Sequence, residues 1–405
     1  MINLEKYIKI FEGGAGGHMA HPYDYDDFTG NDLVEFVDSL FGGKIEHMKE
    51  KLDGFNLSAT MNNAGDVVFV RNDTDRNSPK GGMDLNDINE KWKDKPQQLK
   101  TFGTSAKIIT EIFKNLDVKL FNPDNTHRKI INCECIIAGQ TNILPYASDR
   151  VAFHGYKLYE WNGEKWIEQE DVEGHVEELY KAAEGIDQAK PRPDLVIKST
   201  EEAAKLCEKF KKEIIKLWKN EKLDLSATID EWRHVRFKKM APEWMKEDDD
   251  IFNRLFNNDK SVSLTVIKKR YPEHKEELTD LDKKFKKEIC NNVSGVLDNL
   301  FLNIGNEMID ILDGFVNSGA KDKTIKTLKD SMSNVIQMIQ KSGTDEDKET
   351  LMKALERLKA LGDKYNVAEG IVIMWKGRRM KLTGSFAPIN KALGLRFNYE
   401  KQDNN

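Results

Sequence analysis

The stretch KLDGFNLSATMNNAGDVVFVRND, residues 51–73, decides the fold of the first part of the chain. Two apolar runs within it, 57–61 and 66–70, are rich in residues that favour strands, and Asn-Asn-Ala-Gly separates them. Asn and Gly tolerate the backbone conformations that a tight hairpin turn requires. This stretch therefore predicts a β-hairpin that begins a few residues after Lys51.

Outside this hairpin, four more stretches have the character of strands. Residues 130–137 and 150–161 lie downstream in the same part of the chain. Residues 367–375 and 379–382 lie near the end, and the Lys376-Gly377 pair between them predicts a second tight turn. Strand patterns thus occur at both ends of the chain, which is typical of a domain that is interrupted by an insertion.

The region between these strands has a helical pattern. Apolar residues recur there every three or four positions, for example at Leu206, Phe210, Ile214 and Leu217. We therefore predict an α+β fold in which residues 1–165 and 364–400 form one domain of antiparallel sheets. Residues 166–363 are predicted to form a large helical insertion, which is a candidate module for binding a nucleic acid or a protein partner.

The composition narrows the class of protein. Charged residues make up 33% of the 405 residues and the formal net charge is -6, which excludes a protein that coats nucleic acid with an overall basic surface. No stretch approaches the roughly 18 to 20 apolar residues of a membrane span, and the first residues lack a secretion signal. Four cysteines are too few for a disulfide framework. We expect a cytoplasmic protein without a membrane partner.

Lys51 and the Asp53-Gly54 turn that follows it are the first candidates for chemistry. A lysine that a tight turn presents can act as an amine nucleophile, whereas an exposed lysine beside an ordinary turn is the alternative interpretation. Arg71 follows the second strand of the predicted hairpin. An arginine at this place can hold a ribose or a phosphate, or it can simply be solvated.

Two acids, Glu134 and Glu369, occur in otherwise apolar runs of strand character. Because neighbouring residues of a strand point to opposite faces, Glu134 points away from the two cysteines beside it. A carboxylate is costly to bury without a partner, so we expect Glu134 to face a cleft or a bound group. Arg379 and Lys381 lie two residues apart and share one face of the last strand.

Several familiar motifs fail on inspection. Residues 24–30 lack the glycine of a calcium-binding loop, and the glycine run 13–17 lacks the Gly-Lys-Ser/Thr ending of a phosphate-binding loop. His18 and His21 follow that run. They could contact a metal or a phosphate, or they could be structural.

The motifs become more specific when they are taken in order. They are Lys-x-Asp-Gly, an arginine after the next strand, a glutamate in a strand, an aromatic strand, Glu-Gly-Ile-Val and a final lysine. This order resembles the covalent nucleotidyltransferase superfamily of ATP-dependent ligases and capping enzymes, over residues 44–165 and 366–384. The resemblance implies an ATP-grasp-like ligase adenylation core that uses ATP with Mg²⁺ or Mn²⁺.

The resemblance also implies roles for individual residues. Lys51 resembles the lysine that becomes adenylylated, and Asp53 resembles the aspartate of the same motif. Arg71 resembles the arginine of the next motif. Glu369 resembles the acid that helps to place the metal ion.

The remaining implied roles concern the nucleotide. Glu134 resembles the acid that contacts the nucleoside, and Phe153 resembles the aromatic residue that stacks on the base, with Tyr156 as the alternative. Lys381 resembles the lysine that grips the α-phosphate. Arg379 stands where the family commonly has a further lysine, and it keeps the positive charge.

Within the superfamily, two observations favour a phage-type RNA ligase. Asn56 stands where DNA ligases usually have an arginine, and the stretch after Lys381 is too short for the OB-fold that DNA ligases append. Lysine-rich stretches at 209–212 and 283–287 would suit nucleic-acid phosphates, although interspersed acids also fit solvated helix faces.

We therefore expect an ATP-dependent RNA ligase that joins 5′-phosphate and 3′-hydroxyl ends through lysyl-AMP. Its partner would be RNA rather than DNA, and its compartment would be the host cytoplasm if the chain is phage-encoded. Two alternatives stay open, a DNA ligase and a degenerate ligase-like core that serves as a non-catalytic scaffold.

Overall fold

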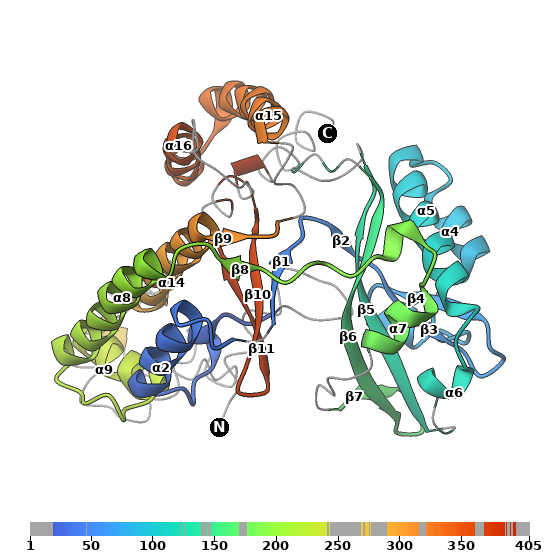
Figure 1. Cartoon of the computed structure of the whole chain (residues 1–405), viewed down its shortest axis with the longest axis horizontal. Coiled ribbons are helices and arrows are strands. Elements are labelled where there is room, and N and C mark those ends of the chain that lie inside the picture. The colour runs from blue at the N-terminus through green and yellow to red at the C-terminus, as the bar shows by residue number, and fades with distance from the viewer. Residues whose placement is uncertain are drawn as a thin grey trace.

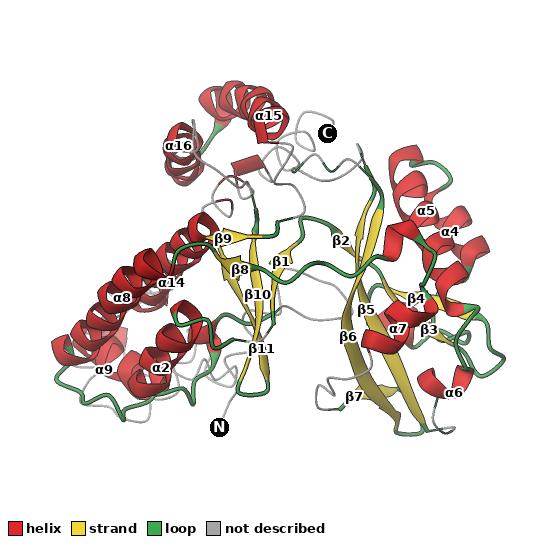
Figure 2. Ribbon diagram, in the orientation of Figure 1, coloured by secondary structure: helices red, strands yellow, loops and turns green. Residues whose placement is uncertain are grey.

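Two antiparallel sheets stand opposite each other, and helices cover the far side of each (Figures 1 and 2). The computed structural model describes residues 19–45, 47–122, 124, 126–138, 144, 146, 148–169, 176–240, 243, 269, 272–274, 276, 290–315, 321–360, 368–384, 386, 389, 392 and 393. None of the helices among these residues combines the length and the apolar character that a membrane span needs.

The larger sheet has six strands and carries the predicted hairpin. Its strands lie in the order β4 (Val67–Val70), β3 (Ser58–Met61), β5 (His127–Ile136), β6 (Arg150–Trp161) and β7 (Trp166–Glu168), and β2 (Phe55–Asn56) also pairs with β5. β3 and β4 are antiparallel neighbours, which confirms the predicted hairpin. β5 and β6 confirm the next two predicted strands.

Helices that precede β5 in the sequence and one helix that follows β7 cover one face of this sheet. They are α4 (Leu85–Trp92), α5 (Pro96–Phe113), α6 (Val118–Phe121) and α7 (Val176–Ala182). Ile109 of α5 lies in one hydrophobic cluster with Ile131 and Cys133 of β5. α4 begins at Leu85 because Asp84 accepts the backbone N–H groups of the first helical turn.

The smaller sheet has three strands and joins the two ends of the chain. β10 (Gly370–Trp375) lies between β1 (Met48–Lys51) and β11 (Arg378–Thr383) and is antiparallel to both. Lys376 and Gly377 have φ angles of 49° and 71°, the left-handed conformation that a tight hairpin turn requires. The turn predicted at this pair is therefore confirmed.

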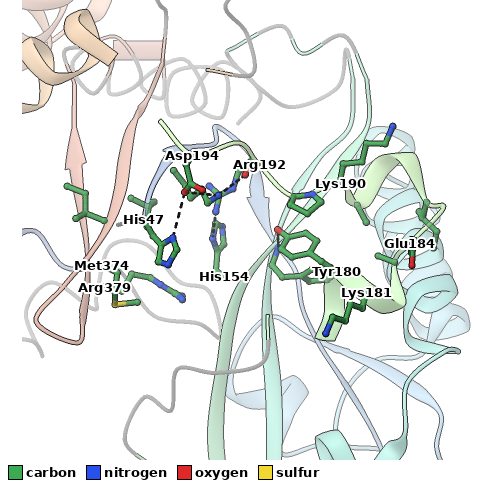
Figure 3. A pocket seen from close by; sticks show the side chains of 18 of the residues that line it. His47, His154, Tyr180, Lys181, Glu184, Lys190, Arg192, Asp194, Met374 and Arg379 are labelled. Carbon is green, nitrogen blue, oxygen red and sulfur yellow. Dashed lines mark hydrogen bonds and ion pairs between the residues drawn. The ribbon is translucent and has the colours of Figure 1, made fainter. Parts of the chain in front are cut away.

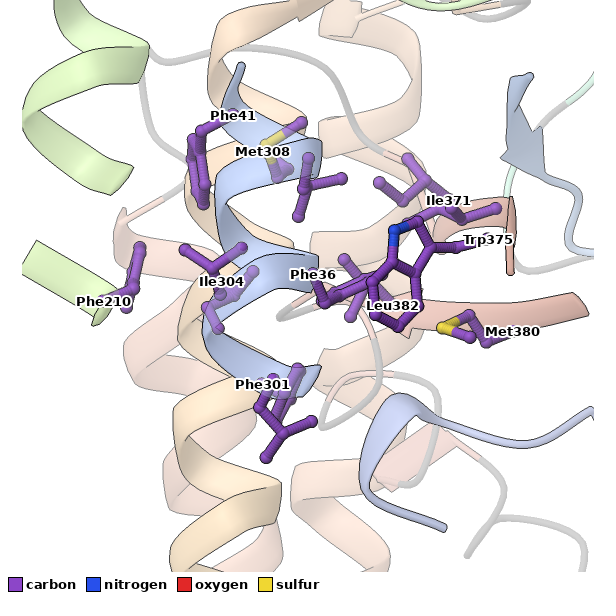
Figure 4. Packing of buried hydrophobic residues seen from close by; sticks show 14 of the residues in the cluster. Phe36, Phe41, Phe210, Phe301, Ile304, Met308, Ile371, Trp375, Met380 and Leu382 are labelled. Atoms are coloured by element: carbon purple, nitrogen blue, oxygen red, sulfur yellow. The ribbon is translucent and has the colours of Figure 1, made fainter. Parts of the chain in front are cut away.

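Helices from the middle of the chain cover the smaller sheet. They are α8 (Thr200–Asn220), α9 (Ile229–Met240) and α14 (Cys290–Ile311), joined by α2 (Gly30–Phe41) from the first part. The Phe36 ring of α2 lies 5.3 Å from the Trp375 ring of β10 and 6.3 Å from the Phe301 ring of α14 (Figure 4). All three belong to one hydrophobic cluster.

The other elements are short or lie at one end of the molecule. α15 (Lys321–Ser342) and α16 (Asp345–Ala360) form a third cluster with residues that include Leu52 and Ile136. β8 (Val196–Ile197) pairs with β9 (Leu312–Asp313). The short helices are α3 (Asp73–Arg76), η1 (Pro22–Asp24), η2 (Asp187–Ala189) and η3 (Pro272–His274).

The structure thus shows an α+β protein with antiparallel sheets. The described part of 166–363 is mostly helical, but its helices α8, α9 and α14 share their core with strands from both ends of the chain. Its division into an adenylation domain and an insertion module stays a prediction, as does the nucleotidyltransferase core. Residues 209–212 lie in α8, whereas 283–287 lie outside the described residues.

Candidate active site

Lys51 is the last residue of β1, and it lies directly opposite Gly370 of β10. Glu369 precedes Gly370, and its Oε1 atom lies 2.5 Å from Lys51 Nζ. The side chains are only 23% and 13% exposed, so the ion pair is largely shielded from water. Strand pairing therefore brings together two predicted site residues that are more than 300 positions apart in the sequence.

The environment of the pair changes the pKa of both groups. Burial alone lowers the pKa of Lys51, but the carboxylates of Glu369 and then Glu134 outweigh burial and raise that pKa above its ordinary value. Burial raises the pKa of Glu369 to about 7, although the charge of Lys51 opposes the rise. Lys51 is therefore a cation in the ligand-free protein.

The face of the smaller sheet that turns away from α2 and α14, its inner face, is rich in cations. Met48, Ile371 and Met380 pack in the cluster with these helices, so the residues that alternate with them turn inward. The inward residues of the three strands are Lys49, Lys51, Val372, Met374, Arg379 and Lys381. The two cations of each outer strand are about 7 Å apart, and Lys49 lies two strand spacings, about 10 Å, from Lys381.

The larger sheet presents Glu134 toward this inner face. Glu134 Oε1 accepts the backbone N–H of Gly54 at 3.0 Å, in the turn that follows Lys51. A Cβ atom on Gly54 would lie 2.7 Å from the Cys135 carbonyl and 2.8 Å from Glu134 Oε1, so only glycine lets the turn approach β5 this closely. Beside this contact, the Asn56 side chain donates to Asn132 Oδ1.

Glu134 is ionised in this setting. Burial raises the pKa of Glu134, but the hydrogen bond from His154 and the charge of Lys51 outweigh burial, and the net pKa lies below its ordinary value. His154 Nε2 lies 3.4 Å from Glu134 Oε2. Glu134 therefore offers a fixed, charged acceptor beside Lys51.

A cavity of about 910 Å³ adjoins these residues. Lys49, Val372 and Arg379 line it from the smaller sheet, and Phe153 and His154 line it from β6, with further residues from α7 and the segment 183–194 (Figure 3). Lys51 lies two residues beyond Lys49 on the same strand face and is not itself among the residues that line the cavity. The volume is within the range of pockets that hold a small-molecule ligand.

Arg379 crosses from the smaller sheet to the larger one. A Cβ atom on Gly155 of β6 would lie 3.1 Å from one guanidinium nitrogen of Arg379 and 3.2 Å from the other. Gly155 has a φ of 107°, which other residues rarely adopt. This glycine gives the arginine its place between the sheets.

The two aromatic candidates of β6 point away from the inner face. Phe153 pairs with Cys133 and Tyr156 pairs with Ile131, and all four lie in the cluster that α4 and α5 cover. A bulge opposite residue 132 inserts one extra residue between Phe153 and Tyr156 and turns His154 inward. Phe153 reaches the cavity at the free edge of β6, where its ring meets Tyr180 edge-on at 5.2 Å.

Asp53 and Arg71 hold the surrounding structure rather than the cavity. Asp53 Oδ2 accepts the backbone N–H of Leu144 at 2.8 Å. The Arg71 guanidinium lies 4.5 Å from the ring centre of Phe102 and 5.9 Å from that of Trp92, on the helix-covered side. Neither residue lines the cavity, in contrast to Arg379.

Lys381 is held at the edge of the smaller sheet. Its backbone N–H donates to the Ala20 carbonyl at 2.9 Å, and its side chain is buried beside Asp24. The His21 ring stacks on Tyr23 with ring centres 5.0 Å apart, and the backbone N–H of His21 donates to Asp24 Oδ2, which fits a structural role. His18 and the glycine run 13–17 lie outside the described residues.

The structure adds two site residues that the sequence motifs do not include, His154 beside Glu134 and Arg192 beside His154. An arginine between two prolines, Pro191 and Pro193, was an available signal, because such a segment is held extended. The bulge that turns His154 inward has no comparable signal in the alternation of apolar and polar residues.

The side chains at this site could supply only some of the ligands that a Mg²⁺ ion needs. No group of three or more His, Cys, Asp and Glu side chains among the described residues could hold a metal by itself. Mg²⁺ commonly takes one or two carboxylates and fills its other positions with water and substrate phosphates. Glu369 beside the cation-rich inner face fits that mode of binding.

Comparisons with known proteins do not place the chain in a family. No family model, no curated protein and no solved structure matches it. The geometry of the site and the order of the motifs are therefore the grounds for a functional proposal.

Proposed function

We propose that the protein is an ATP-dependent polynucleotide ligase that acts through a covalent lysyl-AMP intermediate. The observation that carries this proposal is the buried Lys51–Glu369 pair, which lies next to Glu134 and to a cation-lined cavity. A lysine held there can attack a phosphorus atom, and its cationic neighbours can hold the phosphate groups.

The proposed first step joins Lys51 to AMP. Lys51 Nζ attacks the α-phosphorus of ATP, the new N–P bond forms, and the bond to pyrophosphate breaks. Only about one free lysine in a thousand is unprotonated at pH 7.5, so the amine must lose a proton before attack. Glu369 Oε1 is 2.5 Å away and is the nearest acceptor for that proton.

The following steps transfer AMP and seal the strand. The 5′-phosphate of a polynucleotide attacks the phosphorus of lysyl-AMP, which frees Lys51 and forms an adenylylated end. The 3′-hydroxyl of the other end then attacks the 5′-phosphate, and AMP leaves with the electron pair of the broken anhydride bond. Both steps again develop negative charge beside Lys381 and Arg379.

Several side chains would hold the nucleotide during these steps. Lys49, Arg379 and Lys381 share the inner face with Lys51 and are proposed to bind the phosphates. Glu134 is an ionised acceptor and suits a ribose hydroxyl. A Mg²⁺ or Mn²⁺ ion on Glu369 would supply further neutralisation of phosphate charge.

The base is proposed to bind where the cavity reaches the free edge of β6. Phe153 and Tyr180 form the aromatic part of the cavity wall there. Tyr156 does not line the cavity, and the Lys129 ammonium lies 4.7 Å from its ring centre. Phe153 is therefore the better candidate of the two for contact with the base.

RNA is the proposed substrate class. Asn56 is the residue whose type favours an RNA ligase in the sequence. Its side chain donates a hydrogen bond to Asn132, which lies on β5, the strand that also carries Glu134. Sealing assays with 5′-phosphorylated RNA ends and with nicked DNA at equal salt should show faster joining of RNA. Faster joining of nicked DNA would contradict RNA as the substrate class and would leave the proposed ligase chemistry unchanged.

A single labelling experiment distinguishes the ligase proposal from the alternative of a non-catalytic scaffold. Incubation with ATP labelled in the α-phosphate and Mg²⁺, followed by denaturing electrophoresis, should leave label on the chain. A chain that takes no label with Mg²⁺ or Mn²⁺ would contradict the ligase proposal and favour a non-catalytic core.

A further inference from the structure

The segment that carries Arg192 connects the two sheets behind Glu134. Its backbone is tied to β1, since Leu195 N donates to the Met48 carbonyl and Lys49 Nζ donates to the Arg192 carbonyl, both at 2.8 Å. The Arg192 guanidinium is buried and donates to the Glu50 carbonyl of the same strand. Arg192 is therefore fixed by the strand that presents Lys51.

From this position Arg192 reaches His154 of β6. Its second terminal nitrogen lies 3.5 Å from His154 Nδ1, and His154 Nε2 lies 3.4 Å from Glu134 Oε2 (Figure 3 shows the Arg192–His154 contact). An arginine can only donate and a carboxylate can only accept. His154 must then accept at Nδ1 and donate at Nε2, so its two partners select the Nε2–H tautomer.

The charges around His154 support a neutral ring. Glu134 faces it from β5, Arg192 from the segment before β8, and Arg379 from β11. Burial and the two arginines lower the pKa of His154, and Glu134 does not reverse this effect. The ring is therefore a neutral donor to Glu134 at physiological pH.

We propose that His154 and Arg192 are positioning residues for Glu134. Arg192 holds His154 in the Nε2–H tautomer, and His154 holds Glu134 aimed at the turn of Lys51. This inference rests on the proposed function, in which Glu134 contacts the nucleoside. It adds two residues to the site, and their proposed effect is exerted through the carboxylate of Glu134.

The test is a double-variant cycle on the rate of lysyl-AMP formation, with kcat and KM for ATP measured separately. Loss of a hydrogen bond to a charged group should make His154→Leu about 10- to 100-fold poorer in kcat/KM. In a Glu134→Ala background, the same change should add less than about threefold, because no side-chain acceptor is left for His154 to position. A full multiplicative loss in that background would overturn the proposal.

Conservative variants separate positioning from packing. In His154→Gln the side-chain amide can still donate to Glu134 and accept from Arg192, so this variant should recover most of the rate that His154→Leu loses. Arg192→Met should match His154→Leu. Arg128→Met is the matched control, since Arg128 is equally buried but lies over Trp166, and it should leave the rate unchanged.

A second readout does not depend on ligase activity. Nitrogen-15 spectra of the histidine rings should show His154 as the neutral Nε2–H tautomer, and this signature should be lost in Arg192→Met. The Nδ1–H tautomer in the unaltered chain would overturn the inference. A chain that shows the expected tautomer but forms no lysyl-AMP would contradict the ligase proposal and leave the positioning of Glu134 standing.

Discussion

At the scale of single residues, Lys51 and Glu369 form a buried ion pair in which each group changes the pKa of the other. The lysine is buried at the end of β1, where burial lowers its pKa, and the carboxylates of Glu369 and Glu134 raise that pKa above its ordinary value. The same burial keeps Glu369 reluctant to ionise. Lys51 is therefore held as a cation, and the carboxylate of Glu369, which can accept its proton, stays in contact with it.

This arrangement predicts a pH-dependent stability. The pKa of Glu369 is raised to about 7, so its contribution to stability is complete below the unfolded pKa of about 4.3 and is lost as the pH rises through 7. Between these limits, the unfolding free energy should fall by about 4 kcal/mol relative to Glu369→Gln, which cannot titrate there. Urea unfolding of both proteins at several pH values measures the difference. A difference that does not change with pH would contradict the assigned pKa.

Part of the site could be predicted from residue types alone. A buried acid in an apolar strand needs a partner, and the structure gives Glu134 the ring of His154 and Glu369 the ammonium of Lys51. The direction of Phe153 could not be predicted, because it depends on the bulge in β6. Arg192 could not be predicted either, because it meets Glu50 and His154 through contacts far apart in the sequence.

At the scale of elements, the turn between β1 and β2 links the two sheets. Within four residues the chain passes from Lys51, which pairs in the smaller sheet, to Gly54, whose N–H donates to Glu134 of the larger sheet. The hairpin after it could be predicted from its turn residues, whereas the pairing of β1 with β10 required knowledge of the whole chain.

The turn leads to a prediction about glycine. Gly54→Ala would force a Cβ atom to 2.7 Å from the Cys135 carbonyl, and relief of this overlap should cost about 1–3 kcal/mol of stability. Lysyl-AMP formation should also fall, because the turn must move away from Glu134. Gly103→Ala is the control, since the nearest atom is 4.0 Å away and alanine in α5 should stabilise by about 0.5–1 kcal/mol.

Thermal unfolding and the labelling assay together check this prediction. Loss of stability in Gly54→Ala with an unchanged labelling rate would show that the approach of the turn to Glu134 is dispensable. Equal effects of the two alanine substitutions would show that the contact at Gly54 does not constrain the turn.

At the scale of the whole molecule, the helices of the middle region are part of the core behind the site. Phe301 of α14 is buried between Tyr23 and Phe36, in the cluster that also contains Ile371 and Leu382 of the smaller sheet. The helical character of this region could be predicted from its period. Its shared core could not, because the apolar stripe of a helix does not state which surface it covers.

The shared core predicts that a helix substitution weakens the site from a distance. Phe301→Ala should lower the unfolding free energy by about 3–5 kcal/mol, as is usual for a large residue removed from a core. Met352→Ala on α16 is the control, because Met352 is 56% exposed and its loss should stay within about 0.5 kcal/mol. Chemical denaturation measures both, and a small effect at Phe301 would contradict a core shared by α14 and the smaller sheet.

The measurement that tests the ligase proposal most directly is the intact mass of the chain after incubation with ATP and Mg²⁺. The unaltered protein should gain one AMP, and Lys51→Ala should gain none while keeping its fold. Lys157→Ala is the matched control, since Lys157 forms an equally short 2.5 Å ion pair with Glu168 on the larger sheet and should not affect labelling. One AMP on Lys51→Ala, or none on the unaltered protein, would contradict Lys51 as the nucleophile.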